Sequence, residues 1–290
     1  MNKKDLFDDD DKNRIQSEYD SLINNLLRCN KEGDMEMITK AFRIANEAHW
    51  NMRRRSGEPY IIHPIAVAKI VNQEIGLGAR SITASLLHDI VEDTEYTLDE
   101  VERNFGPKIA TLIDGLTKIS GTYKKETSSS LQAENFRKML LTLSDDMRVI
   151  LIKIADRLHN MRTLDSMPEH KKMKIAGETI FLYAPLAHRL GLFAIKSELE
   201  DLSFKFRQPQ IYEEISSKLK LSERKYYNLL NKFSLPIIDK LSKAGLKFDI
   251  SSRPKSVFSI WKKMQAKNVP FEEIYDVLAI RIVFEPVPEI

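Results

Sequence analysis

One short stretch of this sequence places two pairs of ionisable residues about one helical turn apart. His88-Asp89 is followed by Glu92-Asp93, and most residues around them are apolar. In a helix, residues four apart share a face, so the spacing predicts His88 above Glu92 and Asp89 above Asp93. Ionisable groups on a buried helix are costly unless a cation or hydrogen bonds satisfy them. The pattern would suit a metal ligand beside carboxylates that act on water, but taken alone it is more typical of a charged helix end.

Two other segments offer ligands of the same kind. His63 directly precedes Pro64, which follows a Gly- and Pro-marked turn and opens an apolar-periodic run. Because proline suits the first helical position, we expect His63 at the start of a helix. Asp156 follows an apolar run at 149–152. Taken singly, His63 could cap a helix and Asp156 could pair with a neighbouring arginine.

The combined set of candidate ligands contains two imidazoles and two carboxylates: His63, His88, Asp89 and Asp156. Mixed ligation of this kind suits Mn, Fe, Zn or Ni, and the carboxylates favour the harder ions. A metal ion held this way lowers the pKa of a bound water and stabilises charge on a phosphoryl oxygen. Glu92 and Asp93 would then orient or deprotonate that water. These residues indicate a metallophosphohydrolase.

The bulk composition narrows the class of protein. The 290 residues carry a net charge of +3, which gives no case for nucleic-acid binding by bulk electrostatics. Because Cys29 is the only cysteine, no disulfide can form within the chain, and a reducing, cytoplasmic location is expected. No apolar run approaches the roughly 20 residues of a membrane span, and the N-terminus has no hydrophobic signal core.

Few glycines and long apolar patterns of period 3.6 predict a mostly α fold. Helices are expected near 14–30, 34–51, 64–75, 79–93, 97–104, 107–118, 131–143, 146–164 and 168–189, with a polar loop at 121–130. We expect an all-helical domain at 1–195, a helical bundle linker at 196–245, and a truncated α/β segment at 246–290 with strands at 246–251 and 277–284.

Three motifs together resemble the hydrolase domain of the Rel/SpoT family, which makes and degrades guanosine tetra- and pentaphosphate, the alarmones of the stringent response. They are Arg54–Pro64, the His-Asp-x-x-Glu-Asp-Thr run at 88–94, and the Asp-Arg-Leu-His-Asn-Met run at 156–161. The likeness covers roughly residues 35 to 200 and implies an HD-type metallohydrolase fold. It resumes at 252–264 and 274–281, which resemble the opening of the family's synthetase domain.

The resemblance implies a role for each candidate residue of the hydrolase. The four candidate ligands correspond to the family's Mn²⁺ ligands, and Glu92 and Asp93 to the pair that positions the attacking water; hydrogen-bonding support of the ligands is the alternative for that pair. The residues that resemble nucleotide contacts are Arg54, Arg55, Ser56, Asn160 and Thr163. A guanidinium can stack on a base and fork onto phosphate, whereas the alternative for 54–56 is a solvated basic turn.

Other polar residues lie near the motifs. Lys153 and Arg157 flank the helical face that Asp156 shares with Asn160 and Thr163, so they are weaker candidates for nucleotide contact. His159 is expected to pack or cap locally rather than bind metal, because its angular position departs from that of Asp156. The histidines expected to be structural are His49, His170 and His188.

On the synthetase side, Arg253 and Lys255 resemble ATP-phosphate contacts, and Asp276 resembles a Mg²⁺-binding carboxylate. The family usually has Gly where Ser252 stands and His where Ser256 stands, which puts the turn geometry and some nucleotide contact in doubt. The family's second catalytic acid and its guanine-stacking aromatic would lie beyond residue 290. We therefore expect a fragment of a longer bifunctional protein, in which ribosome contact would come only from regions further along the chain.

The function predicted is Mn²⁺-dependent hydrolysis of guanosine 3′,5′-bis(diphosphate), with GDP or GTP and pyrophosphate as products. One rival is an HD phosphohydrolase of another nucleotide, against which the Arg54–Pro64 motif counts. A second rival is a non-catalytic alarmone-binding module, against which the intact candidate ligands count. A third rival, synthesis by this chain alone, is disfavoured by the incomplete synthetase segment.

Overall fold

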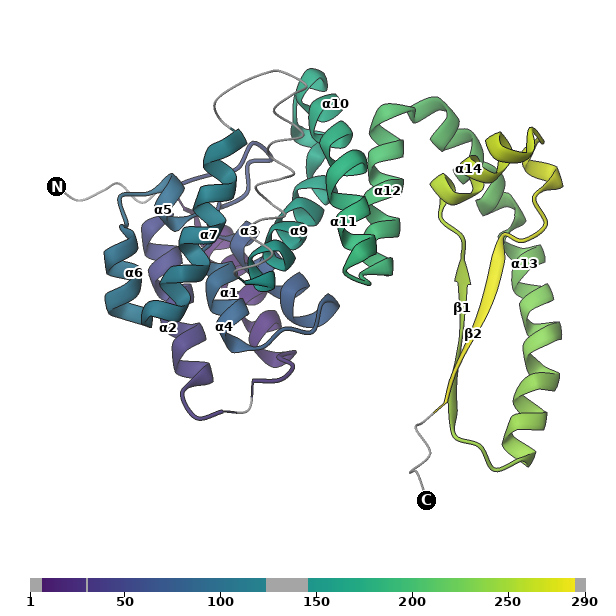
Figure 1. Cartoon of the computed structure of the whole chain (residues 1–290), viewed down its shortest axis with the longest axis horizontal. Helices are drawn as coiled ribbons and strands as arrows, with labels where there is room; N and C mark the ends of the chain where they lie inside the picture. Colours follow the sequence, from purple (N-terminus) through teal and green to yellow (C-terminus); the bar gives the residue numbers. More distant parts are fainter. Residues whose placement is uncertain (1–6, 30, 124–145, 285–290) are drawn as a thin grey trace.

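Apolar positions at helical spacing gather the larger part of the chain around one core. In this computed structural model, which describes residues 7–29, 31–123 and 146–284, that part is an all-helical body, and a smaller helix-and-hairpin unit lies beside it (Figure 1). The predicted mostly α fold is confirmed. The helix predicted at 131–143 and most of the loop predicted at 121–130 lie outside the described residues.

The helices of the body follow one another along the chain. They are α1 (Asp9–Asn24), α2 (Asp34–Ala48), α3 (Ile62–Lys69), α4 (Ala79–Leu86), α5 (Ile90–Asp93), α6 (Leu98–Phe105), α7 (Pro107–Tyr123), α9 (Met147–Arg162), α10 (Glu169–Glu178), α11 (Ala184–Arg189) and α12 (Phe193–Arg207). Shorter π or 3-10 segments join some of them: η1 (Ile70–Glu74), η2 (Leu164–Ser166) and η3 (Thr179–Tyr183).

Helices α3, α4 and α9 form the centre of the body and contact one another. Each is apolar around most of its circumference, so that Ile65, Leu86 and Ile154 have no exposed side-chain surface. A helix of this kind must be covered by other elements. Helix α1 packs on α3, α2 on α4, and α7 on α9. The central helices are therefore held in place: His63 lies in the first turn of α3, His88 and Asp89 follow the end of α4, and Asp156 lies within α9.

Polar caps set where the outer helices begin. Asp8 accepts from the backbone N of Asp11 at 2.8 Å, and the side chain of Asp11 accepts in return from the N of Asp8. This capping box starts α1 at Asp9, before the predicted start at residue 14, because three acidic residues in the first turn suit the positive end of a helix. Thr97 and Glu100 form the same box at the start of α6.

The predicted helix at 79–93 is interrupted in the structure. Helix α4 ends at Leu86, residues 87–89 form a turn, and α5 begins at Ile90. The Nδ1 of His88 donates to the carbonyl of Ser85 at 2.8 Å, a carbonyl that the end of α4 leaves free of an intrahelical partner. A side chain that bonds to nearby backbone competes with the helix. The expected stacking of His88 above Glu92 is therefore wrong, since both do not belong to one helix.

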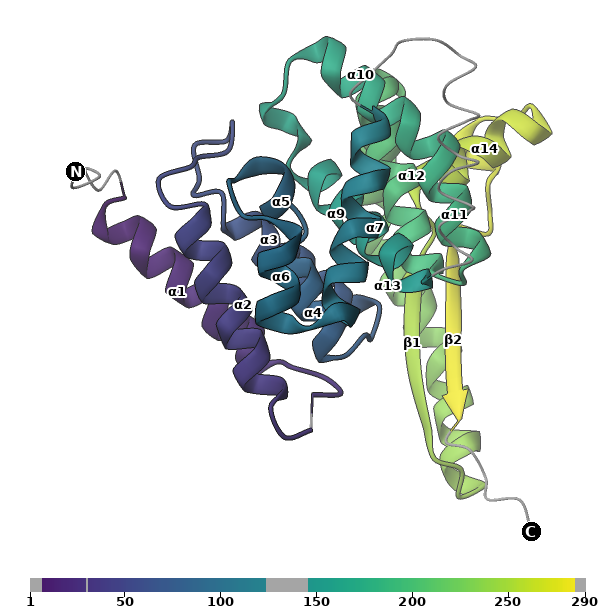
Figure 2. The same ribbon diagram turned by 60° about the vertical axis from the view of Figure 1, so that its left-hand side comes forward.

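The smaller unit is built on one long helix. Helix α13 (Pro209–Lys243) runs for 35 residues where a small bundle was expected, and strands β1 (Phe248–Pro254) and β2 (Leu278–Phe284) extend alongside it (Figure 2). The strands are antiparallel, with Phe248 opposite Phe284. Between them come α14 (Val257–Lys267) and the short η4 (Phe271–Glu273). A second apolar core joins α12 and α13 to α14 through Phe204, Ile215, Phe258 and Ile260.

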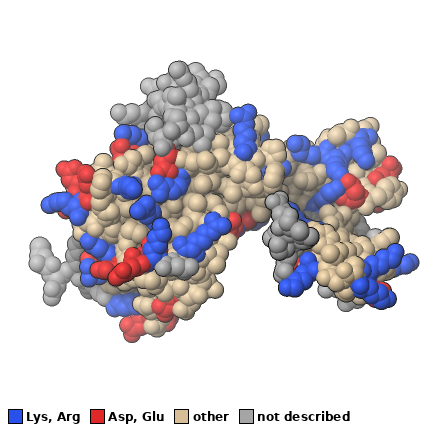
Figure 3. All heavy atoms as spheres, turned by 60° about the horizontal axis from the view of Figure 1, so that its bottom comes forward, with Lys and Arg blue, Asp and Glu red and all other residues tan. Residues whose placement is uncertain are grey.

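The surface carries both signs of charge. Lysines and arginines lie among aspartates and glutamates over the face in Figure 3, as a small net charge leads one to expect. Among the described helices, none combines the length and the apolar character that crossing a membrane requires.

Candidate metal and nucleotide site

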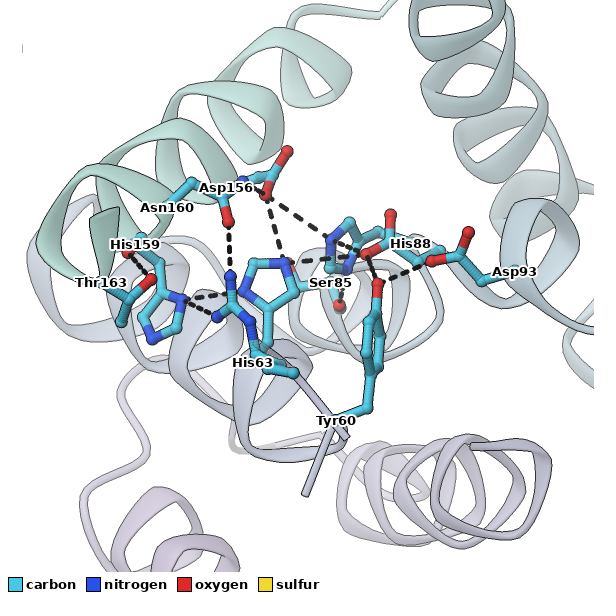
Figure 4. A network of polar contacts seen from close by, with 11 residues as sticks. Tyr60, His63, Ser85, His88, Asp93, Asp156, His159, Asn160 and Thr163 are labelled. Carbon is cyan, nitrogen blue, oxygen red and sulfur yellow. Dashed lines mark hydrogen bonds and ion pairs between the residues drawn. The ribbon is translucent and has the colours of Figure 1, made fainter. Parts of the chain in front are cut away.

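The four candidate ligands converge where α3, the α4–α5 turn and α9 meet. Nε2 of His63 lies 3.2 Å from Oδ1 of Asp156 and 3.7 Å from Oδ2 of Asp89. Nε2 of His88 lies 2.9 Å from the same Asp89 oxygen and 3.9 Å from Asp156 (Figure 4). One ligand atom from each of His63, His88 and Asp156 falls within 4.8 Å of the others. Residues far apart in sequence thus form one cluster.

Both imidazoles are buried, and the charges around them differ. Burial lowers the pKa of His63 below its usual value, despite the neighbouring Asp156. Burial also opposes the charged form of His88, but the charge and contact of Asp89 raise its pKa overall. Burial disfavours ionised Asp89 and Asp156, yet the neighbouring histidines hold the pKa of both carboxyls well below the usual range. The carboxylates are therefore ionised, and they attract positive charge into the cluster.

The donor set fits a metal ion. Nε2 of His88 is fully buried and makes no well-aligned hydrogen bond within the described part of the chain, although Asp89 lies near it. Its other nitrogen, Nδ1, is held by the Ser85 carbonyl. Metal-binding histidines usually have their second ring nitrogen held by a backbone carbonyl or carboxylate, which aims the first at the ion. The carboxylates of Asp89 and Asp156, which favour a proton on His88, would also attract a divalent cation that replaces this proton.

A ring of side-chain contacts surrounds His63 and Asp156. Arg54 donates from Nη2 to Oδ1 of Asn160 at 2.8 Å, and Asn160 donates from Nδ2 to Oδ1 of Asp156 at 2.7 Å. Arg54 Nη1 also lies 3.0 Å from Nδ1 of His159, which lies 2.8 Å from Nδ1 of His63. Burial, followed by the charges of His63 and Arg54, lowers the pKa of His159 to about 3. His159 therefore stays neutral near pH 7.

Tyr60 connects two of the carboxylates. Its hydroxyl lies 2.9 Å from Oδ2 of Asp89 and 2.7 Å from Oδ2 of Asp93. Its ring stacks on His49 with 4.7 Å between centroids. Burial, together with the charge of Asp89, raises the pKa of Tyr60, and the hydroxyl therefore keeps its proton. Asp93 lies near Asp89 as the spacing predicted, because its backbone N donates to the carbonyl of Asp89 at 2.9 Å, which closes one helical turn.

A basic cavity of about 660 Å³ opens beside this cluster. Its lysines and arginines come from three regions of the chain: Arg53, Arg54, Arg55, Lys153, Arg157, Lys171 and Lys174. Ser56, Asn160 and Thr163 also line it. All five residues predicted to contact a nucleotide therefore line the same cavity as Asp156. Arg157 is fixed by Glu178 at 3.2 Å and lies 4.3 Å above the ring of Tyr183. Several cations in one cavity suit a ligand with multiple phosphates.

The loop that carries Arg54 is shaped by a tight turn and by α1. The N of Arg54 donates to the carbonyl of Glu58 at 2.9 Å, and Gly57 takes a φ of 90°, a conformation that favours glycine. Arg53 pairs with Asp11, and Arg14 of α1 donates to Glu58 at 2.8 Å. These contacts hold in place the loop whose residues 53–56 line the cavity.

Sequence reasoning missed four contributors to the site. Tyr60 lies three residues before His63, and His159 lies three residues after Asp156. Their closeness in sequence to candidate ligands could have identified both. Lys171 and Lys174 belong to α10 and carried no signal, because only packing brings α10 to the cavity.

The candidate synthetase residues lie far from this cluster, in the smaller unit. Asp276 accepts from both Lys255 and Lys263, and these two contacts hold the pKa of its carboxyl well below the usual range. Lys263 of α14 is therefore an ion-pair partner of Asp276. Arg253 lies on β1 opposite Ala279 of β2.

Two family models match the sequence in the order of these units. The model described as HD domain matches residues 41–193, more than half of the chain. This chain belongs to the HD domain family. A model described as the region found in RelA and SpoT proteins matches residues 252–290, so the resemblance of this HD-domain chain to the Rel/SpoT family is confirmed.

Curated relatives carry both units. A guanosine-3′,5′-bis(diphosphate) 3′-pyrophosphohydrolase of Aquifex aeolicus is 44% identical over 256 residues, which cover 88% of this chain and 36% of that protein. A GTP pyrophosphokinase of Myxococcus xanthus is 44% identical over 260 residues, which cover 88% and 34%. The chain thus spans about a third of the length of these relatives. A solved structure described as a metazoan ortholog of SpoT that hydrolyzes ppGpp aligns with 59% of this chain and 96% of its own, at a TM-score of 0.45 and 24% identity.

Proposed function

We propose that the helical body hydrolyses the 3′-diphosphate of guanosine 3′,5′-bis(diphosphate), releasing pyrophosphate and GDP, or GTP from the pentaphosphate. The observation that carries this proposal is the cluster of two imidazoles and two carboxylates beside a cavity lined by lysines and arginines. The name of the relative from Aquifex aeolicus supports it. We also propose that the protein is cytoplasmic, where it would encounter this nucleotide.

His63, His88, Asp89 and Asp156 would hold a divalent cation, for which we propose Mn²⁺. Imidazole nitrogen with carboxylate oxygen suits that ion. When bound, it would lower the pKa of a water molecule and offset charge on the phosphoryl oxygens. The chain's own part is to keep the four ligand side chains close together, with both imidazoles buried, so that little rearrangement is needed when the ion binds.

The basic cavity would hold the nucleotide next to this cluster. Its volume falls within the range of about 300–1,000 Å³ that is usual for small-molecule sites. Arg54, Arg55 and Ser56 would contact the base and phosphates, and Asn160 and Thr163 the ribose and base. Arg157 cannot swing away from the cavity, because Glu178 and Tyr183 fix it. A phosphate placed there would meet charges that are already oriented.

We assign the positioning of the attacking water to Glu92 and Asp93. The two residues follow the ligand turn on α5, and the hydroxyl of Tyr60 connects Asp93 to Asp89. A carboxylate in this place can accept a proton from water as the oxygen attacks phosphorus. The 3′ oxygen of the ribose leaves with the product nucleotide.

We also propose that residues 246–290 belong to a GTP pyrophosphokinase domain of the whole protein. The match to the RelA and SpoT region supports this. Arg253 and Lys255 would contact ATP phosphates, and Asp276 would bind Mg²⁺ once the ion displaced the two lysines that now hold it. The rest of the proposed division is a hydrolase domain at 1–195 and a helical linker at 196–245, which takes in most of α12 and all of α13.

Release of pyrophosphate from guanosine tetraphosphate, with and without Mn²⁺, tests the proposed hydrolase. We expect metal-dependent turnover in the native chain and none in Asp156→Asn, which should also lose Mn²⁺ binding. Glu92→Gln and Asp93→Asn should keep the KM and lose kcat by about a hundredfold or more. Asp165→Asn is the control, because Asp165 is an exposed carboxylate paired with Lys205.

Three results would contradict parts of this proposal. Full activity of Asp156→Asn would remove the metal hypothesis. A rise in KM alone in the amide variants would make Glu92 and Asp93 substrate contacts. Faster turnover of deoxynucleoside triphosphates than of guanosine tetraphosphate would assign the cavity to another nucleotide.

A further inference from the structure

A line of hydrogen bonds runs from Arg54, in the loop that lines the basic cavity, to His63, one of the proposed metal ligands. Nη1 of Arg54 lies 3.0 Å from Nδ1 of His159, and that same Nδ1 lies 2.8 Å from Nδ1 of His63 (Figure 4). The two imidazoles are buried, with 4.9 Å between their centroids. One nitrogen of His159 thus serves two neighbours, and this decides where the hydrogens lie.

Arginine sets the direction of the first hydrogen bond. A guanidinium has five N–H donors and no acceptor, so Nδ1 of His159 must offer Arg54 a lone pair. A neutral imidazole has one N–H and one lone pair, which places the hydrogen of His159 on Nε2. Because Nδ1 of His159 then has no hydrogen to donate, the 2.8 Å contact requires Nδ1 of His63 to be the donor. The lone pair of His63 is left on Nε2.

This lone pair points toward negative charge. Nε2 of His63 lies 3.2 Å from an oxygen of Asp156 and 3.7 Å from an oxygen of Asp89. Electron pairs that face one another in a buried place repel, so the hydrogen bond from His63 to His159 must hold this arrangement until a cation lies among them. The line of hydrogen bonds therefore prepares His63 to bind a cation rather than to donate to the carboxylates.

We propose that His159 is a positioning residue which, held as an acceptor by Arg54, keeps the hydrogen of His63 on Nδ1 and leaves Nε2 to bind the metal ion. The inference rests on the metal site of the proposed function. A second path joins Arg54 through Asn160 to Asp156 at 2.8 Å and 2.7 Å. The arginine that faces the nucleotide thus orients one imidazole and one carboxylate ligand, which couples substrate contact to metal binding.

Nitrogen NMR of the metal-free chain with labelled histidines measures the hydrogen positions directly. We expect the neutral form of His63 to carry its hydrogen on Nδ1 and His159 to carry its own on Nε2, with assignments from single His→Leu variants. A neutral His63 with its hydrogen on Nε2, or a His159 with its hydrogen on Nδ1, would overturn the proposal. This measurement needs neither metal nor substrate, so it stands apart from the test of the hydrolase.

Two variants then test what His159 does for the metal site. His159→Leu removes the acceptor at similar bulk, whereas His159→Asn places an amide oxygen near the position of Nδ1. We expect the Kd for Mn²⁺, measured by equilibrium dialysis on protein with native circular dichroism, to rise about 10- to 100-fold in the leucine variant and to recover in the asparagine variant. His170→Leu, at an exposed position of α10, is the matched control and should bind as the native chain does.

Each result of the variants has one meaning. Native affinity in His159→Leu, or equal loss in the leucine and asparagine variants, would show that the acceptor does not orient His63. If the native chain itself fails to bind Mn²⁺, the proposed function fails, and the NMR result still decides where the hydrogens of the two histidines lie.

Discussion

At the scale of single residues, the site depends on hydrogen bonds that aim ionisable groups. The hydroxyl of Tyr60 has one hydrogen and two carboxylates within reach, Asp89 at 2.9 Å and Asp93 at 2.7 Å. If Asp89 binds a cation, the hydroxyl can donate to Asp93 alone. Tyr60 would then orient the proposed water-positioning carboxylate whenever the metal is bound.

Tyr60→Phe should therefore lower kcat for alarmone hydrolysis by about 10- to 100-fold, the usual cost of removing a hydrogen bond that supports a metal site. The chain should still fold, because the phenyl ring keeps the stacking on His49. Steady-state kinetics with guanosine tetraphosphate measure the effect. Tyr96→Phe is the control, because the hydroxyl of Tyr96 accepts a hydrogen bond from Asn104 at 2.7 Å, away from the ligand cluster. Unchanged kcat in Tyr60→Phe would show that Asp93 needs no such support.

At the scale of elements, close approach of helices brings the ligands together. Helix α9 carries Asp156, His159 and Asn160, and α7 packs directly on it. At Gly115 of α7, an added Cβ would lie 3.0 Å from Cγ2 of Val149. Val149 is buried and β-branched, so its side chain has little freedom to move away.

Gly115→Ala should consequently destabilise the body by about 1 kcal/mol, because overpacking of about 1–3 kcal/mol outweighs the roughly 1 kcal/mol that alanine gains in a helix. Gly177→Ala, at a helical glycine whose added Cβ would meet nothing within 4 Å, should stabilise by about 1 kcal/mol. Equilibrium urea unfolding measures both variants. A rise in stability for both would mean that α7 and α9 tolerate a wider spacing than the structure shows.

At the scale of the whole molecule, α12 belongs to two cores. Ile195 and Leu199 lie in the core of the body, whereas Phe204 lies in the core that includes α14. Asp201 of α12 accepts from the backbone N of Phe258 at 2.8 Å and of Val257 at 3.1 Å, at the start of α14. A carboxylate at the N-terminus of a helix is favourable for both its hydrogen bonds and the helix dipole. Asp201 thus fastens the smaller unit to the body.

Asp201→Ala should loosen α14 by about 2 kcal/mol, because hydrogen bonds to a charged group are lost, and amides of α14 should exchange with deuterium roughly 30-fold faster. Amides of α3 and α9 should exchange at native rates. Asp165→Ala, which removes an exposed ion pair with Lys205, is the control and should leave both regions unchanged. Equal acceleration in α9 would show that the two units unfold together rather than separately.

The candidate ligands and the helical class could be predicted from the sequence because they depend on local patterns. Period 3.6 marks a buried helix wherever it falls, and His63, His88 and Asp156 have side chains whose burial needs a cation or a partner. The fold class and the family resemblance are confirmed by the structure and the family models. The roles of the individual residues stay predictions until the variants are measured.

Tertiary structure alone decided how these residues meet. Periodicity cannot show that His88 would take the Ser85 carbonyl and end α4, since that contact competes with the helix only once the imidazole is buried. Nor can it show that His159 would contact His63, 96 residues away in sequence, or that α10 would bring Lys171 to the cavity. Such contacts depend on how the helices pack, because side chains distant in sequence become neighbours only when the core closes around α3, α4 and α9.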